Sequence, residues 1–295
     1  MMKLQGIFPA LTSSFDYQGK LYKAKVFHNI EKLNRIALGG YLVCGSTGET
    51  PLLSVSERLQ LMAWVREACA EDRTLIAGVG AESVDETVHI ANAAASLGFD
   101  AALALTPFYY RNQMHRPDTQ ALYFRAVADR SKIPVLIYNI PQVTGYDVPV
   151  DVVAELSEHP NILGMKDSSG NLERMKQVCE SVTQRFHVLS GSGLNFPQAL
   201  KMGARGAILA IANALPYACV TIWEAFRTRE QEAVEDWQAR ITPPGKLIAA
   251  KHGIPGLKYA MDLNGYYGGP PRLPLVPPNV EAKAEIEAAF DGLRS

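Results

Sequence analysis

Short apolar runs alternate with segments of helical periodicity along the chain, and this alternation limits the fold more than any other feature of the sequence. The runs begin near Ile7, Tyr41, Leu75, Ala101, Val135, Ile162, His187 and Gly206. Continuous apolar runs are typical of parallel strands covered on both faces. Strands separated by helices form right-handed βαβ units. Eight such units predict an α/β fold, a (β/α)8 or TIM barrel.

The glycine patterns argue against a nucleotide-binding open sheet. Gly78-x-Gly80 continues to Ser83, and Gly191-x-Gly193 continues to Phe196, so neither completes the GxGxxG pattern. No GxxxxGK[ST] loop occurs in the sequence either. The closed barrel is therefore the better prediction.

After Arg229 the pattern changes to helix alone. The helical segments are Glu230–Gln238, Lys246–Asn264 and Glu281–Leu293. We expect residues 1–229 to form the barrel catalytic domain and residues 230–295 to form a helical extension packed on it. Two capping-box patterns, Ser54-x-x-Glu57 and Ser83-x-x-Glu86, predict helix starts within the barrel.

Composition and charge exclude several classes of partner. The chain has 295 residues, of which 47% are hydrophobic and 20% charged, enough for a large core. Lys+Arg 29 against Asp+Glu 30 leaves no basic excess for nucleic acid or an anionic membrane. Gly206–Trp223 lacks charge, but Asn213-Ala-Leu-Pro216 interrupts it, which favours a strand, a turn and a helix over a membrane span.

The cysteines and histidines indicate neither disulfides nor a metal. Cys44, Cys69, Cys179 and Cys219 are scattered, as expected of reduced thiols in a cytoplasmic protein. No HxH or HExxH spacing occurs. Cys44 is expected to be a buried small apolar side chain. Met1–Gln5 shows no basic start followed by an apolar stretch, so no secretory signal is expected.

One lysine stands at the end of an apolar strand, where a barrel carries its reactive groups. Lys166 follows Ile162–Met165. Burial favours a neutral amine, which can attack a ketone and form a Schiff base. Tyr138, at the neighbouring strand end, has a phenol that can move protons. Position alone leaves alternatives open: a lysine that reaches the rim or pairs with Asp167, and a core tyrosine.

Two further strand ends carry candidate residues. Ser46 and Thr47 lie between two glycines in a tight turn, whose hydroxyl and N–H groups suit a carboxylate. An ordinary helix-capping turn is the alternative. Tyr109 and Tyr110, followed by Arg111, indicate an exposed aromatic loop suited to an interface.

Together these residues resemble the family of pyruvate-dependent class I aldolases and lyases, which includes dihydrodipicolinate synthase, N-acetylneuraminate lyase and 4-hydroxy-2-oxoglutarate aldolase. The resemblance covers nearly the whole chain, in family order and spacing. It rests on Gly45-Ser-Thr-Gly-Glu49, Thr106-Pro-Phe-Tyr-Tyr110, Tyr138-Asn-Ile-Pro141, Thr144-Gly145 and Gly164-Met-Lys-Asp-Ser168.

The resemblance implies a role for each of these positions. Lys166 would form the Schiff base with pyruvate, and Tyr138 would shuttle protons over it. Ser46 would link Tyr138 to Tyr109 of a neighbouring subunit in a proton relay. The remaining roles implied are that Ser46 and Thr47 hold the pyruvate carboxylate and that Gly191 and Ile208 line the pyruvate pocket. A homotetramer built as a dimer of dimers is implied, with no metal or organic cofactor.

One position bears on which member of the family this is. Dihydrodipicolinate synthases carry an arginine in the loop after the strand 5 tyrosine, where it holds the carboxylate of aspartate semialdehyde. The matching residue is Val143, which cannot make that contact. Phe108 and Val55 likewise stand where the feedback-lysine pocket of that branch has a tyrosine and a polar residue.

The chain resembles the 4-hydroxy-2-oxoglutarate aldolases more strongly, over His159–Ser168 and from Gly253 to Pro270. Ser168 is a candidate for contacting the substrate 4-hydroxyl. Thr47 departs from that branch, whose animal enzyme has Asn there. We therefore expect cleavage or formation of a C–C bond in a 4-hydroxy-2-oxo acid, with pyruvate and glyoxylate as products of 4-hydroxy-2-oxoglutarate.

Other functions stay open. The nearest is dihydrodipicolinate synthesis from pyruvate and aspartate semialdehyde, with another cation replacing the arginine. A sugar-acid aldolase or dehydratase is a further member of the same family. A different class is a non-catalytic barrel that senses a 2-oxo acid, although a sensor would have no need of the Lys166, Tyr138 and Ser46 set.

Overall fold

The computed structural model describes residues 4–293 and contains the eight expected strands. They are β1 Gly6–Pro9, β2 Gly40–Val43, β3 Thr74–Gly78, β4 Ala101–Leu105, β5 Val135–Asn139, β6 Ile162–Asp167, β7 His187–Ser190 and β8 Gly206–Leu209. Almost every strand residue is buried, as continuous apolar runs predict for strands covered on both faces.

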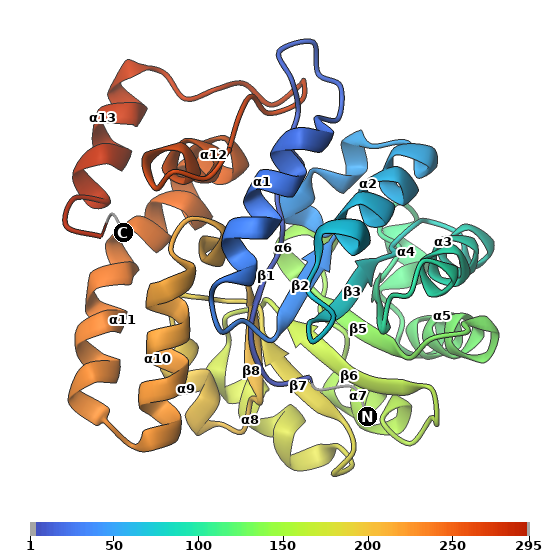
Figure 1. The fold of residues 1–295 in the computed structure, drawn as a ribbon. Coiled ribbons are helices and arrows are strands. Elements are labelled where there is room, and N and C mark those ends of the chain that lie inside the picture. Colours follow the sequence, from blue (N-terminus) through green and yellow to red (C-terminus); the bar gives the residue numbers. More distant parts are fainter. Residues whose placement is uncertain (1–3, 294–295) are drawn as a thin grey trace. The chain divides into compact units, whose positions relative to one another are not determined.

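The strand order is that of a (β/α)8 barrel. It runs β1-β8-β7-β6-β5-β4-β3-β2 (Figure 1), and the pairs from β3 through β8 are parallel. A parallel bridge from Ala10 to Leu42 joins the first strand to the second, so the order returns on itself. The predicted TIM barrel is confirmed.

Helices alternate with the strands. The longer ones are α1 Lys23–Asn34, α2 Val55–Ala68, α3 Val84–Ser96, α5 Pro117–Arg130, α7 Val150–Leu156, α8 Leu172–Ser181, α9 Phe196–Lys201 and α10 Pro216–Thr228. Short helices follow the strand ends, namely η1 Ser46–Gly48, η2 Thr50–Leu52, α4 Arg111–Met114, α6 Pro141–Thr144 and η3 Ile211–Asn213. The short helices therefore lie in the segments that carry the candidate residues.

The predicted helix starts are largely correct. Ser54 and Glu57 form a complete capping box at α2. At α3 only half of the box forms, since the Ser83 side chain accepts from the Glu86 N–H. The Gly206–Trp223 stretch is a strand, a turn and the start of α10, and no helix within residues 4–293 is long and apolar enough to span a bilayer.

The chain forms two compact units. The first contains Thr74–Ile208 and the second contains Gly6–Arg73 together with the chain from Leu209 onward. The first unit includes β3 through β7 and most of β8, whereas β1, β2 and the C-terminal helices belong to the second. The expected division into a barrel of residues 1–229 and an extension of residues 230–295 does not coincide with these two units and stays a prediction. The expectation that Met1–Gln5 is not part of a secretory signal also stays a prediction, and residues 1–3 lie outside the described residues.

The C-terminal helices differ from the expected bounds, since the first is longer than predicted and the last ends at Ala289 rather than at Leu293. They are α11 Gln231–Lys246, the π-helix η4 Leu247–His252, α12 Gly253–Leu263 and α13 Val280–Ala289. The first does not end at Gln238 but continues through Pro243 and Pro244. Each proline removes a backbone donor without forcing the chain out of the helix, and the wider π turns follow directly.

Candidate active site

The amine of Lys166 meets the phenol of Tyr138. The two residues are register partners in the β5–β6 pair, and Lys166 Nζ donates to Tyr138 Oη at 3.3 Å. The same nitrogen lies 4.3 Å from the centroid of the tyrosine ring. Lys166 is only 4% exposed and Tyr138 only 5%. A lysine at the rim is therefore ruled out.

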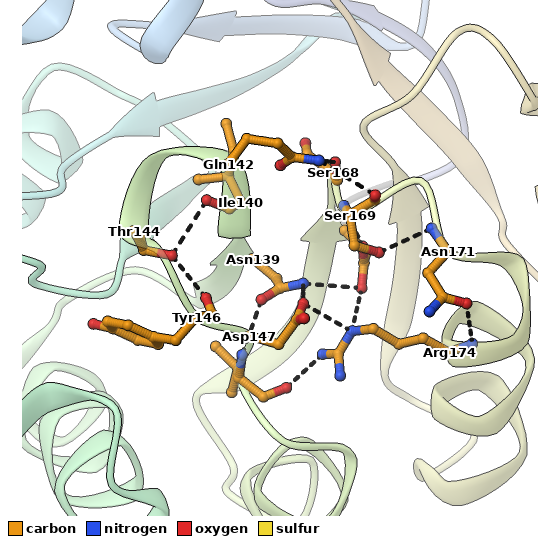
Figure 2. Close-up of polar contacts among 12 residues, drawn as sticks. Asn139, Ile140, Gln142, Thr144, Tyr146, Asp147, Ser168, Ser169, Asn171 and Arg174 are labelled. Atoms are coloured by element: carbon orange, nitrogen blue, oxygen red, sulfur yellow. Dashed lines mark hydrogen bonds and ion pairs between the residues drawn. The ribbon is translucent and has the colours of Figure 1, made fainter. Parts of the chain in front are cut away.

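The alternative pairing of Lys166 with Asp167 is also wrong. Asp167 Oδ2 lies 2.9 Å from Arg174 Nε instead. Successive side chains of a strand point to opposite faces, so Asp167 faces α8 while Lys166 faces Tyr138. Figure 2 shows this second face, where Asn139, Asp147 and Arg174 converge.

Ser168 and Gly191 are in direct contact. A Cβ added at Gly191 would lie 1.9 Å from Ser168 Oγ and 3.0 Å from its Cα. Only glycine fits there, because the backbone of Ser168 cannot swing away as a long side chain could. Ile208 is fully buried in β8, whose Ala207 pairs with Ser190 of β7. Gly191 comes directly after Ser190 and Ile208 directly after Ala207, so each of the two predicted pocket residues lies one position beyond a member of this register pair.

Val143 lies on α6 and is 43% exposed. Its neighbour Gln142 donates its side-chain amide to the carbonyl oxygens of Ser168 at 3.1 Å and Ser169 at 3.3 Å (Figure 2). The segment after β5 is therefore tied to the segment after β6. Because the Gln142 amide is already engaged in this tie, it is less suited to binding substrate.

Arg111 reaches the same segment from α4. A Cβ at Gly145, whose φ is +80°, would lie 2.6 Å from the Arg111 Cζ. The guanidinium therefore packs against the glycine backbone, two residues beyond Val143. A cation stands beside α6 even though the loop itself carries valine.

Tyr109 lies in an exposed loop, as predicted. Its side chain is 76% exposed and its ring packs edge-on against Tyr110 with the centroids 5.2 Å apart. The Glu82 carboxylate accepts the Tyr109 N–H at 3.0 Å and the Phe108 N–H at 3.2 Å, which holds the loop. The proposed relay to a neighbouring subunit stays a prediction.

Tyr146 was missed by sequence reasoning. Its hydroxyl donates to the Pro107 carbonyl, which links the loops after β4 and β5. Burial raises the pKa of this phenol to about 12, so it stays a donor at neutral pH. Arg174 was missed as well, because it lies in α8, outside the motifs from which the site residues were predicted. The only sequence signal for these two residues was their position, since Tyr146 directly follows the Thr144-Gly145 motif and Arg174 comes soon after the Gly164–Ser168 motif.

The Ser46–Thr47 turn belongs to the second compact unit. Thr47 is buried, Ser46 is half-buried, and both lie in η1. Two side chains fasten the turn: Ser13 Oγ donates to the Gly48 carbonyl at 2.6 Å, and Thr50 Oγ1 donates to the Gly45 carbonyl at 2.8 Å. These two hydrogen bonds fix the backbone of the turn, as a turn that binds a carboxylate would require.

A buried ion pair supports the end of this turn. Glu49, with a left-handed φ of +56°, places its carboxylate 2.6 Å from Lys258 Nζ of α12, and both side chains are at most 1% exposed. Glu49 also accepts the Arg272 N–H at 2.8 Å. Burial lowers the pKa of Lys258, while Glu49 works against that shift.

Cys44 is not a nucleophile. It is 2% exposed, and burial raises the pKa of its thiol to about 12, so the thiol stays protonated. All four cysteines are free. Across residues 4–293 no group of three or more His, Cys, Asp or Glu side chains could hold a metal ion.

The family is decided by comparison of the whole chain. The model of the dihydrodipicolinate synthetase family matches residues 3–292. This chain belongs to that family. Its members are Schiff-base aldolases of the lyase class that use pyruvate and an aldehyde. The predicted resemblance to this family is therefore confirmed, and with it the prediction of a lyase-type aldolase.

Relatives cover the chain from end to end. A 4-hydroxy-tetrahydrodipicolinate synthase of Methanothrix thermoacetophila is 34% identical over 96% of this chain and 94% of the relative. The protein of the same name in Methanosphaerula palustris is 32% identical, over 97% and 99%. The chain is therefore similar to synthases over their full length.

Solved structures share the fold. A dihydrodipicolinate synthase from Bacillus anthracis matches with a TM-score of 0.95 at 24% identity, covering both chains completely. The synthase of Aquifex aeolicus matches with a TM-score of 0.92 at 26% identity, covering 99% of each chain.

Proposed function

We propose that this protein cleaves or forms a C–C bond in a 4-hydroxy-2-oxo acid, with 4-hydroxy-2-oxoglutarate as the substrate that fits best. The observation that supports it is the buried Lys166 amine 3.3 Å from the Tyr138 phenol, beside an α6 segment with valine at position 143. The first part is the arrangement a Schiff base needs. The valine means that this loop has no arginine to hold the carboxylate of a longer acceptor aldehyde such as aspartate semialdehyde.

The proposed reaction has three stages, which are imine formation, C–C bond cleavage and release of pyruvate. The amine of Lys166 attacks C2 of the 2-oxo acid. Tyr138 then donates a proton to the C2 hydroxyl, which leaves as water, so that a protonated imine and a Tyr138 phenolate are formed. The imine draws electrons, so the C3–C4 bond breaks as Tyr138 accepts the 4-hydroxyl proton. Glyoxylate leaves and an enamine stays on the lysine. Protonation at C3 and addition of water then release pyruvate and restore the amine.

We propose that residues of the first compact unit bind the part of the substrate that leaves as glyoxylate. Ser168, in contact with Gly191, offers a hydroxyl for the substrate 4-hydroxyl. Arg111, packed on Gly145, offers a cation for the distal carboxylate. Ser46 and Thr47 are proposed to hold the carboxylate next to the ketone.

Trapping with borohydride tests the Schiff base. Reduction in the presence of pyruvate, followed by peptide mapping, is expected to give one pyruvyl adduct on Lys166. Lys166→Ala should form no adduct and should lose at least about 10³-fold in turnover. Wild-type protein that binds pyruvate without forming an adduct would instead favour the non-catalytic 2-oxo-acid sensor.

A second candidate function is 4-hydroxy-tetrahydrodipicolinate synthesis, because relatives at 29–34% identity carry that name. Comparing glyoxylate with aspartate semialdehyde as the acceptor for pyruvate separates the two. The proposal requires faster turnover with glyoxylate. It further requires that Val143→Arg shift the preference toward aspartate semialdehyde, with Val143→Met as the matched control for side-chain size.

A further inference from the structure

The ends of β5 and β6 carry two pairs of side chains on opposite faces. Tyr138 pairs in register with Lys166, and Asn139 pairs with Asp167. The first pair places the phenol next to the amine. The second pair lies directly behind it, one residue along each strand, and forms hydrogen bonds of its own.

This second pair is the buried centre of a polar network (Figure 2), whose outer member Asp147 has a side chain that is 45% exposed. Asn139 Nδ2 donates to Asp167 Oδ2 at 3.3 Å and to Asp147 Oδ1 at 2.8 Å, while its Oδ1 accepts the Val148 N–H at 2.9 Å. Asp167 Oδ1 accepts the Ser169 N–H at 2.7 Å. Asn139 and Asp167 are each 1% exposed.

One cation holds the network together. Arg174 Nε lies 2.9 Å from Asp167 Oδ2 and 3.5 Å from Asp147 Oδ1, and its Nη2 donates to the Val148 carbonyl. A buried carboxylate without a cation is costly. Without Arg174, the carboxylates of Asp167 and Asp147 would repel each other across the Asn139 amide.

We propose that Arg174, Asp167 and Asn139 are positioning residues that fix the ends of β5 and β6, and so hold the Lys166 amine against the Tyr138 phenol. They do not touch the substrate. The inference deepens the proposed function and rests on it, because it assigns the network to imine formation at Lys166.

The geometry explains why such a clamp matters. At 3.3 Å the contact between amine and phenol is already at the long end of hydrogen bonding, so a small shift of either strand end breaks it. Reacting groups need positions held to within about 0.5 Å. The backbone pairing of β5 and β6 reaches Asn139 and Asp167, and the network adds side-chain hydrogen bonds from both of these residues at the same point.

The test compares the rate of borohydride trapping at saturating pyruvate, expressed per folded molecule from circular dichroism. Arg174→Gln is expected to trap about 10- to 100-fold more slowly. Its half-saturation for pyruvate should change less than about 3-fold, because binding contacts are untouched. Arg174→Lys, which keeps the charge, should recover part of the rate.

A matched control and a second variant keep the test decisive. Arg125→Gln removes an exposed arginine that pairs with Glu155 in the same compact unit, and should trap at the wild-type rate. Asn139→Ala keeps the ion pair between Asp167 and Arg174 and removes the side-chain amide, with its hydrogen bonds to Asp167, Asp147 and the Val148 N–H. It should also slow trapping, even if Arg174→Gln fails to fold.

The outcomes separate the two proposals. If the wild type forms the adduct and both Arg174→Gln and Asn139→Ala trap at its rate per folded molecule, the positioning role is refuted and the proposed function stands. If the wild type forms no adduct, the proposed function fails and the positioning role fails with it.

Discussion

At the scale of single residues, the least expected feature is the ion pair between Glu49 and Lys258. Both belong to sequence motifs, yet the sequence gives no reason to pair a residue after β2 with one in α12. Both are almost completely buried, and Lys258 Nζ also donates to the Pro270 carbonyl and lies 4.6 Å from the ring centroid of Phe15. The pair fixes the turn that carries Ser46 and Thr47.

Removing one partner of this pair should be costly. Lys258→Met is expected to lower the free energy of unfolding by about 3–5 kcal/mol, because the Glu49 carboxylate stays buried without its cation. Urea unfolding measures the loss. Lys251→Met, at an exposed pair with Glu285, should change the midpoint very little. Equal effects of the two changes would contradict this account of the buried pair.

At the scale of elements, Glu57 and Arg272 join the start of α2 to the segment between α12 and α13. Nη2 and Nη1 of Arg272 donate to the carboxylate at 2.7 and 2.9 Å, while Glu57 also accepts the Ser54 N–H of its own capping box. Hydrogen bonding to Arg272 is the main cause that lowers the pKa of Glu57 from 4.5 to about 2.

The depressed pKa makes this link sensitive to acid. Its contribution is complete above pH 4.5, where the carboxylate is charged even in the unfolded chain, and is lost as the pH falls toward 2. Glu57→Gln should therefore lower the free energy of unfolding by about 1–2 kcal/mol at pH 7. Urea unfolding at several pH values should show the difference shrinking below pH 4.5. A constant difference down to pH 2 would rule the link out.

At the scale of the whole molecule, we predict that subunit assembly bears on the reaction through Tyr109, which is exposed together with Tyr110. If Tyr109 acts in the site of a neighbouring subunit, a variant of lowered activity and an inactive variant can complement each other. Tyr109→Phe is then expected to lower activity by removing the hydroxyl, and Lys166→Ala is expected to abolish it by removing the amine. A mixed oligomer can pair an intact lysine with an intact tyrosine.

We expect activity to return when the two variants are unfolded and refolded together, and not when each is refolded alone. Sedimentation velocity should show a species of about four times the 32.3 kDa chain mass. Tyr110→Phe, mixed with Lys166→Ala, is the matched control. No recovery in an oligomer shown by mass spectrometry to contain both variants would place the Tyr109 hydroxyl outside the relay.

The sequence by itself determined the number of strands, their nature, and most helix starts, because apolar periodicity and capping boxes are properties of neighbouring residues. It also placed Lys166 and Tyr138 at strand ends. Only the tertiary structure decided that these two meet in register, and that Asp167 turns away toward Arg174. Register and ion pairing depend on which segments pack together, and so do the contact of Ser168 with Gly191 and that of Glu49 with Lys258. No pattern within one segment carries that information.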